Sequence, residues 1–199
     1  AATGIAVDIL VNNAGIASFG YFDDTSEETF NRVLNVNLQG VVLGCRHIMP
    51  LLEKSSRGLI VNVASIFGIM TMPMMSPYHA SKFAVRGFTE ALQQDLKYQN
   101  KNVDALCVMP GGIKTNIAKR AVYETSVSSI EQHFDKLART TPAQAAEAII
   151  GAIEGNCSRL FIGLDAKIVQ FIVRLLPGRY SSVLNRFLGI DKVISREGQ

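Results

Sequence analysis

Short apolar runs alternate with long amphipathic stretches along this 199-residue chain. The apolar runs lie at residues 7–13 (VDILVNN), 58–65 (GLIVNVAS), 102–112 (NVDALCVMPGG) and 159–163 (RLFIG). Each is short, rich in branched aliphatic side chains and bounded by polar or glycine residues, a pattern that predicts buried β-strands. The run at 58–65 is apolar at consecutive positions, which is typical of a parallel sheet covered by helices on both faces.

The stretches between these runs predict helices. Residues 26–53 favour one long helix that starts after a capping box formed by Thr25 and Glu28. Residues 76–99 favour a second long helix, with Pro77 in its first turn, where proline is tolerated. Its expected apolar stripe contains Phe88, Ala91 and Leu92.

A third helix is expected after Thr141, which forms a capping box with Gln144 and is followed by Pro142 at the first helical position. Residues 113–140 predict a polar, irregular loop with short helices beside a substrate site. Residues 164–199 predict one or two amphipathic helices.

This alternation of strands and helices predicts a single domain built on a doubly wound, Rossmann-like parallel α/β sheet. In such sheets ligands bind beyond the carboxyl ends of the strands. Asn13, Ser65 and Pro110 each close a predicted strand, so we expect these residues to lie near one another.

Composition narrows the function classes. Hydrophobic residues make up 48% and charged residues 19%, an ordinary globular balance. The net charge of +3, without a dense basic run, gives no support for nucleic-acid binding. The cysteines Cys45, Cys107 and Cys157 lack a C-x-x-C spacing, which favours reduced thiols in a cytoplasmic protein and no metal site. The sequence has no run of about 18 apolar residues, so it predicts no membrane-spanning helix.

The stretch SPYHASKFA places Tyr78 four residues before Lys82, one helical turn apart on the same face. A free tyrosine titrates near ~10, and a nearby ammonium group stabilises the phenolate and lowers that pKa. Such a tyrosine can exchange a proton in general acid–base catalysis. The same spacing also occurs by chance on solvated helices.

Two further polar residues strengthen the catalytic interpretation. Ser65 ends a buried strand, where its hydroxyl can hydrogen-bond a carbonyl oxygen as charge develops on it, although a serine can also simply start a turn. Asn37 lies in a predicted helix interior, where asparagine is unfavourable unless its amide finds partners. It can alternatively be a polar residue satisfied by backbone or water.

Together these residues resemble the short-chain dehydrogenases/reductases. The matching motifs are NNAG at 12–15, NVNL at 35–38, YHASK at 78–82 and PGGIKT at 110–115. Ser65 follows Asn37 by 28 residues and precedes Tyr78 by 13, both typical separations in that family. The motifs occur in the family's order, and with the strand pattern the resemblance covers nearly the whole chain.

The resemblance implies an oxidoreductase that interconverts an alcohol and a ketone or aldehyde by hydride transfer with NAD or NADP. In this family's pattern Tyr78 exchanges the proton with the substrate oxygen, and Lys82 lowers the tyrosine pKa and holds the nicotinamide ribose. Ser65 polarises the carbonyl, and Asn37 binds a water that links Lys82 to solvent. The remaining cofactor contacts implied by the motifs are Asn13, Ala14, Gly15, Pro110, Gly111, Ile113 and Thr115.

The family's opening strand and glycine-rich T-G-x-x-x-G-x-G turn have no counterpart in residues 1–199. The expectation is therefore a partial domain that lacks roughly the first 70–80 residues of the family pattern, including the diphosphate-binding turn. We therefore expect residues 1–199 alone to bind dinucleotide poorly and to be inactive. The first strand would be an exposed apolar edge of the sheet. The residues that select NAD or NADP are not among those present. The alternative is a non-catalytic interaction subunit.

Four methionines, at positions 70, 72, 74 and 75, lie between Ser65 and Tyr78. Because methionine is flexible and fills irregular apolar space, they favour a pocket wall for a bulky apolar alcohol or ketone, or else plain packing.

The tail combines apolar residues with Lys167, Arg174, Arg179 and Arg186. A basic amphipathic helix of this kind can lie on a membrane surface, but more often it covers its own domain or a partner subunit. The resemblance also implies a homodimer or homotetramer packed through the helices at 26–53 and 76–99.

Overall fold

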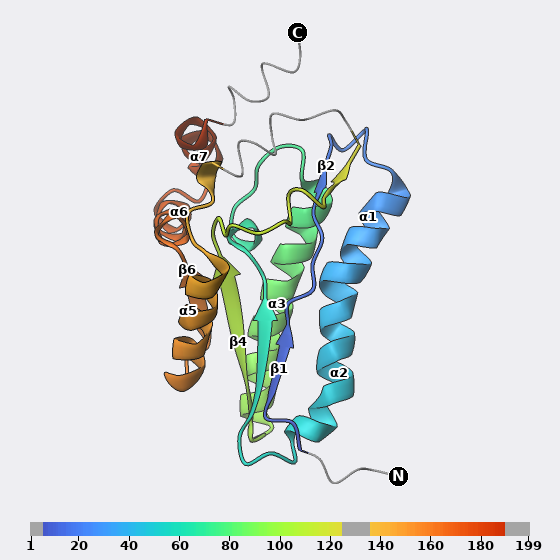
Figure 1. Ribbon diagram of the computed structural model, residues 1–199, viewed down its shortest axis with the longest axis vertical. Helices are drawn as coiled ribbons and strands as arrows, with labels where there is room; N and C mark the ends of the chain where they lie inside the picture. The colour runs from blue at the N-terminus through green and yellow to red at the C-terminus, as the bar shows by residue number, and fades with distance from the viewer. Residues whose placement is uncertain (1–5, 125–135, 190–199) are drawn as a thin grey trace.

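Four parallel strands form the main sheet of the protein. The computed structural model describes residues 6–124 and 136–189. The strands are β1 (Ile9–Asn12), β3 (Gly58–Val63), β4 (Val103–Pro110) and β6 (Arg159–Ile162), in the spatial order β1-β3-β4-β6. In Figure 1 the strands point upward, so their carboxyl ends meet in the upper half of the molecule. This parallel α/β architecture confirms the predicted Rossmann-like fold.

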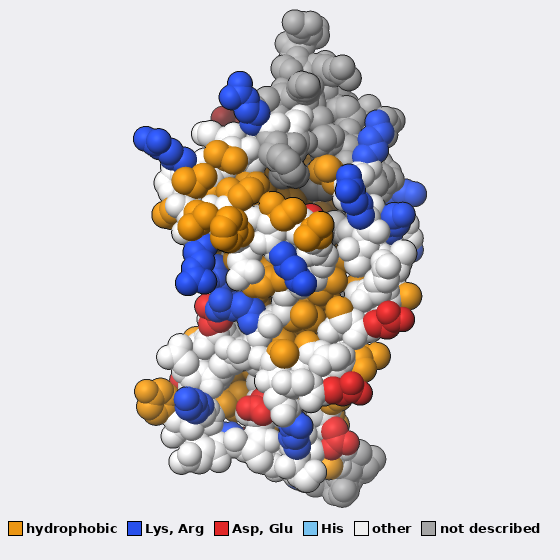
Figure 2. Space-filling view, turned by 90° about the vertical axis from the view of Figure 1, so that its left-hand side faces the viewer, with side chains coloured by type: hydrophobic (Ala, Val, Ile, Leu, Met, Phe, Trp, Pro, Cys, Tyr) orange, Lys and Arg blue, Asp and Glu red, His pale blue; other side chains and the backbone are white. Residues whose placement is uncertain are grey.

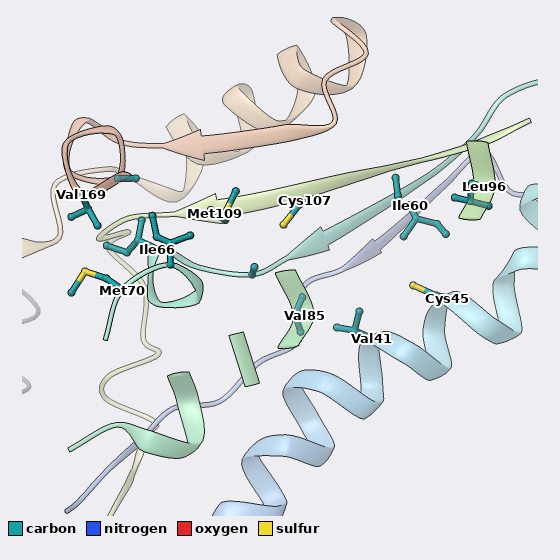
Figure 3. Close-up of a cluster of buried hydrophobic side chains, with 14 of the residues drawn as sticks. Val41, Cys45, Ile60, Ile66, Met70, Val85, Leu96, Cys107, Met109 and Val169 are labelled. Carbon is teal, nitrogen blue, oxygen red and sulfur yellow. The ribbon is translucent and has the colours of Figure 1, made fainter. Parts of the chain in front are cut away.

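Helices cover both faces of this sheet. Successive residues of β4 point to opposite faces, so Ala105, Cys107 and Met109 pack in the core formed with the long helices, shown in Figure 3. That core lies against α2 (Gly40–Leu52) and α3 (Ser76–Tyr98). Leu106 and Val108 face the other way and pack in a cluster with α5 (Pro142–Glu154). A strand enclosed on both faces must be apolar at consecutive positions, as β3 and β4 are.

The first long helix is unbroken from Glu27 to Leu52 but is not α-helical throughout. It consists of α1 (Glu27–Leu34), one π-helical turn (Asn35–Gln39) and α2. The predicted capping box is also wrong, because Ser26 is the N-cap and its side chain accepts a hydrogen bond from the Thr29 N–H. The Thr25 hydroxyl instead donates to the Tyr21 carbonyl at 2.8 Å.

The other helix starts agree with the sequence. Thr141 and Gln144 form a complete capping box at α5, and Pro77 lies in the first turn of α3. The apolar stripe of α3 is partly wrong, because Ala91 is exposed. Phe88 and Leu92 pack against the core, where the buried apolar residues of α3 are Val85 and Leu96.

A second, two-stranded parallel sheet pairs β2 (Ser18–Phe19) with β5 (Val122–Tyr123). The Phe19 and Tyr123 rings stack with centroids 5.2 Å apart. The prediction of an irregular loop with short helices at 113–140 did not include β5. Residues 125–135 of that segment lie outside the described part of the chain.

The first strand lies at an edge of the sheet, as predicted. Ile9 and Val11 point to the same face and are 44% and 50% exposed. The C-terminal segment forms α6 (Leu164–Leu175) and α7 (Tyr180–Leu188), which agrees with the expectation of one or two helices; residues 190–199 lie outside the described range. Within residues 6–124 and 136–189, none of the helices has the length and apolar character needed to cross a membrane.

Candidate active site

A cavity of about 350 Å³ opens at the carboxyl ends of the strands. Two of the four predicted catalytic residues, Ser65 and Tyr78, lie on its wall. Three of the predicted cofactor-binding residues, Gly111, Ile113 and Thr115, share that wall. The structure therefore gathers residues separated by up to 50 positions into one site, at the place where open α/β sheets bind ligands.

Ser65 lies two residues after the end of β3 and caps a short 3-10 helix, Ile66–Gly68. Its backbone is extended, and its hydroxyl oxygen accepts a hydrogen bond from the Phe67 N–H at 3.1 Å. This bond uses the oxygen as an acceptor and leaves the O–H free to donate toward the cavity and Tyr78.

Tyr78 lies in the first turn of α3, where Pro77 and the buried loop before it fix the direction of the helix. The side chain is buried, and burial raises its pKa to about 12, while a hydrogen bond with the Ser65 side chain acts in the opposite direction. This differs from the expected lowering by Lys82. The physical reason is that the cost of desolvating a phenolate exceeds the stabilisation that these neighbours give it.

Lys82 lies behind the tyrosine, one turn further along α3. Its ammonium nitrogen is 5.6 Å from the centre of the Tyr78 ring and donates to the Val63 carbonyl at 3.0 Å. Burial lowers the lysine pKa to about 8. An ammonium group has three N–H donors, and Val63 is the one hydrogen-bond acceptor for it within the described residues. Donors therefore remain for hydroxyl groups of a bound ligand.

Asn37 occupies the middle of the π-helical turn and is completely buried. Its amide oxygen accepts from the Ile16 N–H at 2.8 Å, and its amide nitrogen donates to the Ile16 carbonyl at 2.9 Å and the Ser81 hydroxyl at 2.9 Å. Asn37 thus joins the NNAG segment to α3 one residue before Lys82. A π-turn of this kind is frequent at functional sites.

Replacing Asn37 with Ala is expected to lower the free energy of unfolding by about 2–4 kcal/mol, because it removes two hydrogen bonds to the half-buried backbone of Ile16 and one to the buried Ser81 hydroxyl. Asn35→Ala is the matched control, since Asn35 belongs to the same π-turn but is exposed, and its effect is expected to stay within about 0.5 kcal/mol. Urea denaturation of both variants measures the difference. Equal stabilities would contradict the anchoring role.

The segment PGG (110–112) begins at the last residue of β4. It is held by a residue that was not predicted from the sequence. The Asp165 carboxylate accepts a hydrogen bond from the Gly112 N–H at 2.6 Å. A Cβ atom on Gly111 would collide with that carboxylate, so a larger residue there would displace Asp165. Asp165 lies three residues after the end of β6, in the first turn of α6, and this position near a strand end was the available signal.

The remaining predicted cofactor residues lie outside the cavity wall. Asn13 and Ala14 are exposed beyond the end of β1, and Pro110 closes β4. Gly15 lies against the site, because a Cβ there would be 3.4 Å from the Asn37 amide oxygen and 3.5 Å from the Lys82 nitrogen. Its missing side chain keeps the approach to Lys82 open.

The four methionines divide into two pairs. Met72 and Met75 line the cavity, whereas Met70 and Met74 are buried and do not line it. His79 holds the same loop: its Nε2 accepts from the Met72 N–H at 3.1 Å and its Nδ1 lies 3.2 Å from the Phe67 carbonyl. The neutral imidazole, whose pKa is lowered by burial, satisfies both contacts. Both ring nitrogens of His79 are therefore engaged in holding this loop.

The Rossmann-like fold, with serine, tyrosine and lysine beside one cavity, defines a dehydrogenase-like site. A family model described as short chain dehydrogenase matches residues 3–125 of this chain. The chain belongs to the short-chain dehydrogenase family.

Individual relatives and solved structures agree with this assignment. The putative oxidoreductase SadH of Mycobacterium tuberculosis is 38% identical over 176 residues, which cover 87% of this chain and 64% of that protein. Cyclopentanol dehydrogenase of Comamonas is 41% identical over 114 residues, covering 57% and 45% of the two chains. A crystal structure of a Burkholderia phymatum short chain dehydrogenase/reductase in complex with NAD superimposes with a TM-score of 0.74 at 25% identity, over 85% of this chain and 67% of that one.

Proposed function

We propose that the protein interconverts an alcohol and a ketone or aldehyde with NAD or NADP. The observation that carries this proposal is the pairing of the Ser65 and Tyr78 hydroxyls on one cavity wall, with the Lys82 ammonium directly behind the Tyr78 ring. Two hydroxyl groups can hold one substrate oxygen, Ser65 by donating a hydrogen bond and Tyr78 by exchanging the proton. Because burial keeps the Tyr78 phenol protonated, the ligand-free site can donate a proton to a carbonyl oxygen.

The site also fits a nicotinamide dinucleotide. Lys82 has donors left for ribose hydroxyls, Gly15 leaves the approach to it open, and the exposed Asn13 and Ala14 continue this surface. The turn that contains Pro110, Gly111, Ile113 and Thr115 would hold the nicotinamide half of the dinucleotide. The bound nicotinamide supplies the hydride donor or acceptor.

Asn37 would complete a route for protons. The Asn37 amide oxygen and the Lys82 nitrogen lie 3.4 and 3.5 Å from the point that a Cβ atom on Gly15 would occupy, so a water bound beside Gly15 would connect them. In this proposal Asn37 both anchors the NNAG segment and orders the water through which Lys82 exchanges protons with solvent.

The cavity walls support a bulky apolar substrate. Apolar side chains from five segments surround Ser65 and Tyr78, among them Phe19, Phe67, Met72, Met75, Ile113, Ile117, Leu137, Ile168 and Leu184. A volume of about 350 Å³ is within the range of small-molecule sites. Apolar residues outnumber the polar ones on the wall, which are Ser65, Tyr78, Thr115, Arg139, Thr140 and Asp165, and this favours apolar substrates over sugars and hydroxy acids.

The substrate proposal is tested with the protein expressed from its complete coding sequence. Long-chain and polycyclic ketones are expected to be reduced with at least about tenfold higher kcat/KM than small hydroxy-acid precursors or sugars, since each buried methylene contributes roughly 0.8 kcal/mol. The rate at which the absorbance of NADH or NADPH falls, at fixed enzyme concentration, gives kcat/KM for each substrate class. Equal kcat/KM for the two classes would contradict the apolar pocket.

The alternative is a non-catalytic interaction subunit, because residues 1–199 contain no glycine-rich diphosphate turn. The buried Lys82 argues against it: a subunit without chemistry gains nothing from burying an ammonium group with one described acceptor. We also propose a homodimer or homotetramer that packs through α2 and α3, where Leu43 and Phe83 are exposed.

A further inference from the structure

Helix α6 presents an apolar ridge to solvent. Its inner face buries Ala166 and Val169 in the core. Its outer face carries Leu164, Ile168, Phe171 and Leu175, which are 73%, 39%, 63% and 60% exposed. Their spacing of four, three and four residues places them on one stripe of the helix. We call these four residues the α6 ridge.

The exposed apolar surface extends beyond α6. Leu176, at the end of that helix, and Val183 of α7 are each 40% exposed. Figure 2 shows hydrophobic side chains gathered on this face of the molecule with Lys and Arg side chains around them. Single exposed apolar residues are ordinary, whereas a contiguous group marks an interaction surface.

The charges on this face are basic. Lys167, Arg174, Arg179 and Arg186 are exposed. The one acidic residue between Leu164 and Leu188 is Asp165, whose carboxylate is turned inward to the Gly112 N–H. This segment holds four of the chain's 20 basic residues and one of its 17 acidic residues, so it carries a net charge of +3, equal to that of the whole chain.

An apolar ridge on a segment whose exposed charged residues are all basic matches an anionic lipid surface. The apolar side chains can enter the boundary of the acyl chains while the basic groups remain among anionic headgroups. A second copy of the chain fits less well, because a symmetric contact would place the basic side chains of both copies against one another. With 12 residues, α6 is about 18 Å long and suits an orientation in the membrane plane.

The ridge is continuous with the cavity. Leu164 and Ile168 belong both to the exposed ridge and to the cavity wall, next to the buried Val169 and Leu184. A substrate dissolved in the bilayer could therefore reach Ser65 and Tyr78 along apolar side chains without entering water.

We infer that α6 and α7 form a membrane-docking surface that binds anionic bilayers peripherally and delivers apolar substrates from the bilayer to the cavity. Docking itself is independent of the proposed chemistry, while substrate delivery rests on it. The surface requires two groups of residues at once, the α6 ridge for insertion and the basic side chains for attraction.

The test is flotation of the protein, expressed from its complete coding sequence, with phosphatidylcholine vesicles that contain or lack phosphatidylglycerol. We expect binding to the anionic vesicles and at least tenfold weaker binding to the neutral ones. The variant Phe171→Ser/Leu175→Ser is expected to lose at least tenfold in affinity, and Arg174→Glu/Arg179→Glu about thirtyfold or more on anionic vesicles. Neither pair lines the cavity.

Matched controls change the same chemistry elsewhere. Phe22→Ser/Ile150→Ser removes exposed apolar side chains from the loop before α1 and from α5, and Lys54→Glu/Arg57→Glu makes the same change in net charge between α2 and β3. Both controls are expected to float like the wild type. Circular dichroism and thermal unfolding verify that all variants fold.

Three outcomes would overturn the inference. The first is no flotation with anionic vesicles. The second is flotation that survives both Phe171→Ser/Leu175→Ser and Arg174→Glu/Arg179→Glu. The third is a dimer that dissociates in Phe171→Ser/Leu175→Ser without any vesicle binding. Reduction of a short-chain, water-soluble ketone separates this failure from failure of the proposed function. If that reduction persists without vesicle binding, the docking surface is wrong and the chemistry stands.

Discussion

Tyr78→Phe is expected to reduce turnover of an apolar ketone by about 10²- to 10⁴-fold, the range that general acid–base groups contribute. The substitution removes one hydroxyl from the cavity wall and keeps the buried ring, its edge contact with Phe67 included. Dinucleotide affinity and thermal stability should change little. Steady-state kinetics of the protein expressed from its complete coding sequence, with dinucleotide titration by fluorescence, measures both effects.

Tyr98→Phe is the matched control for this experiment. Tyr98 ends α3, is exposed and lies far from the cavity, so its hydroxyl should be dispensable. A Tyr78→Phe variant that retains more than about a tenth of wild-type kcat would show that another group exchanges the proton.

Lys82→Met is expected to abolish most activity and to stabilise the fold at the same time. At pH 7 the wild type buries a charged ammonium group whose pKa is about 8 instead of 10.5, and a difference of that size corresponds to roughly 3 kcal/mol. Losing the hydrogen bond to the Val63 carbonyl offsets about 1 kcal/mol. The net gain in unfolding free energy is therefore about 2 kcal/mol, while kcat falls by about 10²-fold or more.

The dependence of stability on pH identifies Lys82 as the cause. Between about pH 8 and 10.5 the unfolded chain holds the Lys82 proton and the folded protein does not. Unfolding therefore takes up a proton, so stability rises with pH across this window. Lys82→Met should remove that rise, whereas Lys97→Met, at an exposed position of α3, should keep it. A destabilised Lys82→Met variant with normal turnover would contradict the assignment.

Much of the site could be predicted from sequence because ligands of open α/β sheets bind beyond the carboxyl ends of the strands. Ser65 and Pro110 close apolar runs, and parallel strands bring such ends to one edge of the sheet. Tyr78 and Lys82 share a helix, so their proximity follows from a local spacing. These features depend on short-range patterns, which a single sequence displays.

The features that were missed depend on contacts across the fold. Asp165 reaches Gly112 from 53 residues away, and β2 pairs with β5 over two residues each, lengths too short to leave a periodic pattern. The π-turn around Asn37 was also not predicted, because the apolar periodicity of a helix hardly changes when one turn widens.

The expected lowering of the Tyr78 pKa was wrong for a related reason. The spacing to Lys82 is visible in the sequence, but the depth at which both side chains are buried is not. Desolvation acts on each group separately and opposes its charged form, so it raises the pKa of the tyrosine and lowers that of the lysine. A bound cation or substrate dipole beside the phenol would be needed to reverse that balance.

The central claim is that Ser65, Tyr78 and Lys82 surround the place where a hydride and a proton pass to one substrate. The direct measurement follows deuterium from reduced dinucleotide labelled at the transferable position into the alcohol formed from an apolar ketone, by mass spectrometry. The account predicts one deuterium on the carbinol carbon with the wild type, and with Tyr78→Phe a product yield lower by about 10²-fold or more. Alcohol formed without deuterium on that carbon, or labelled product at an equal rate from Tyr78→Phe, would contradict it.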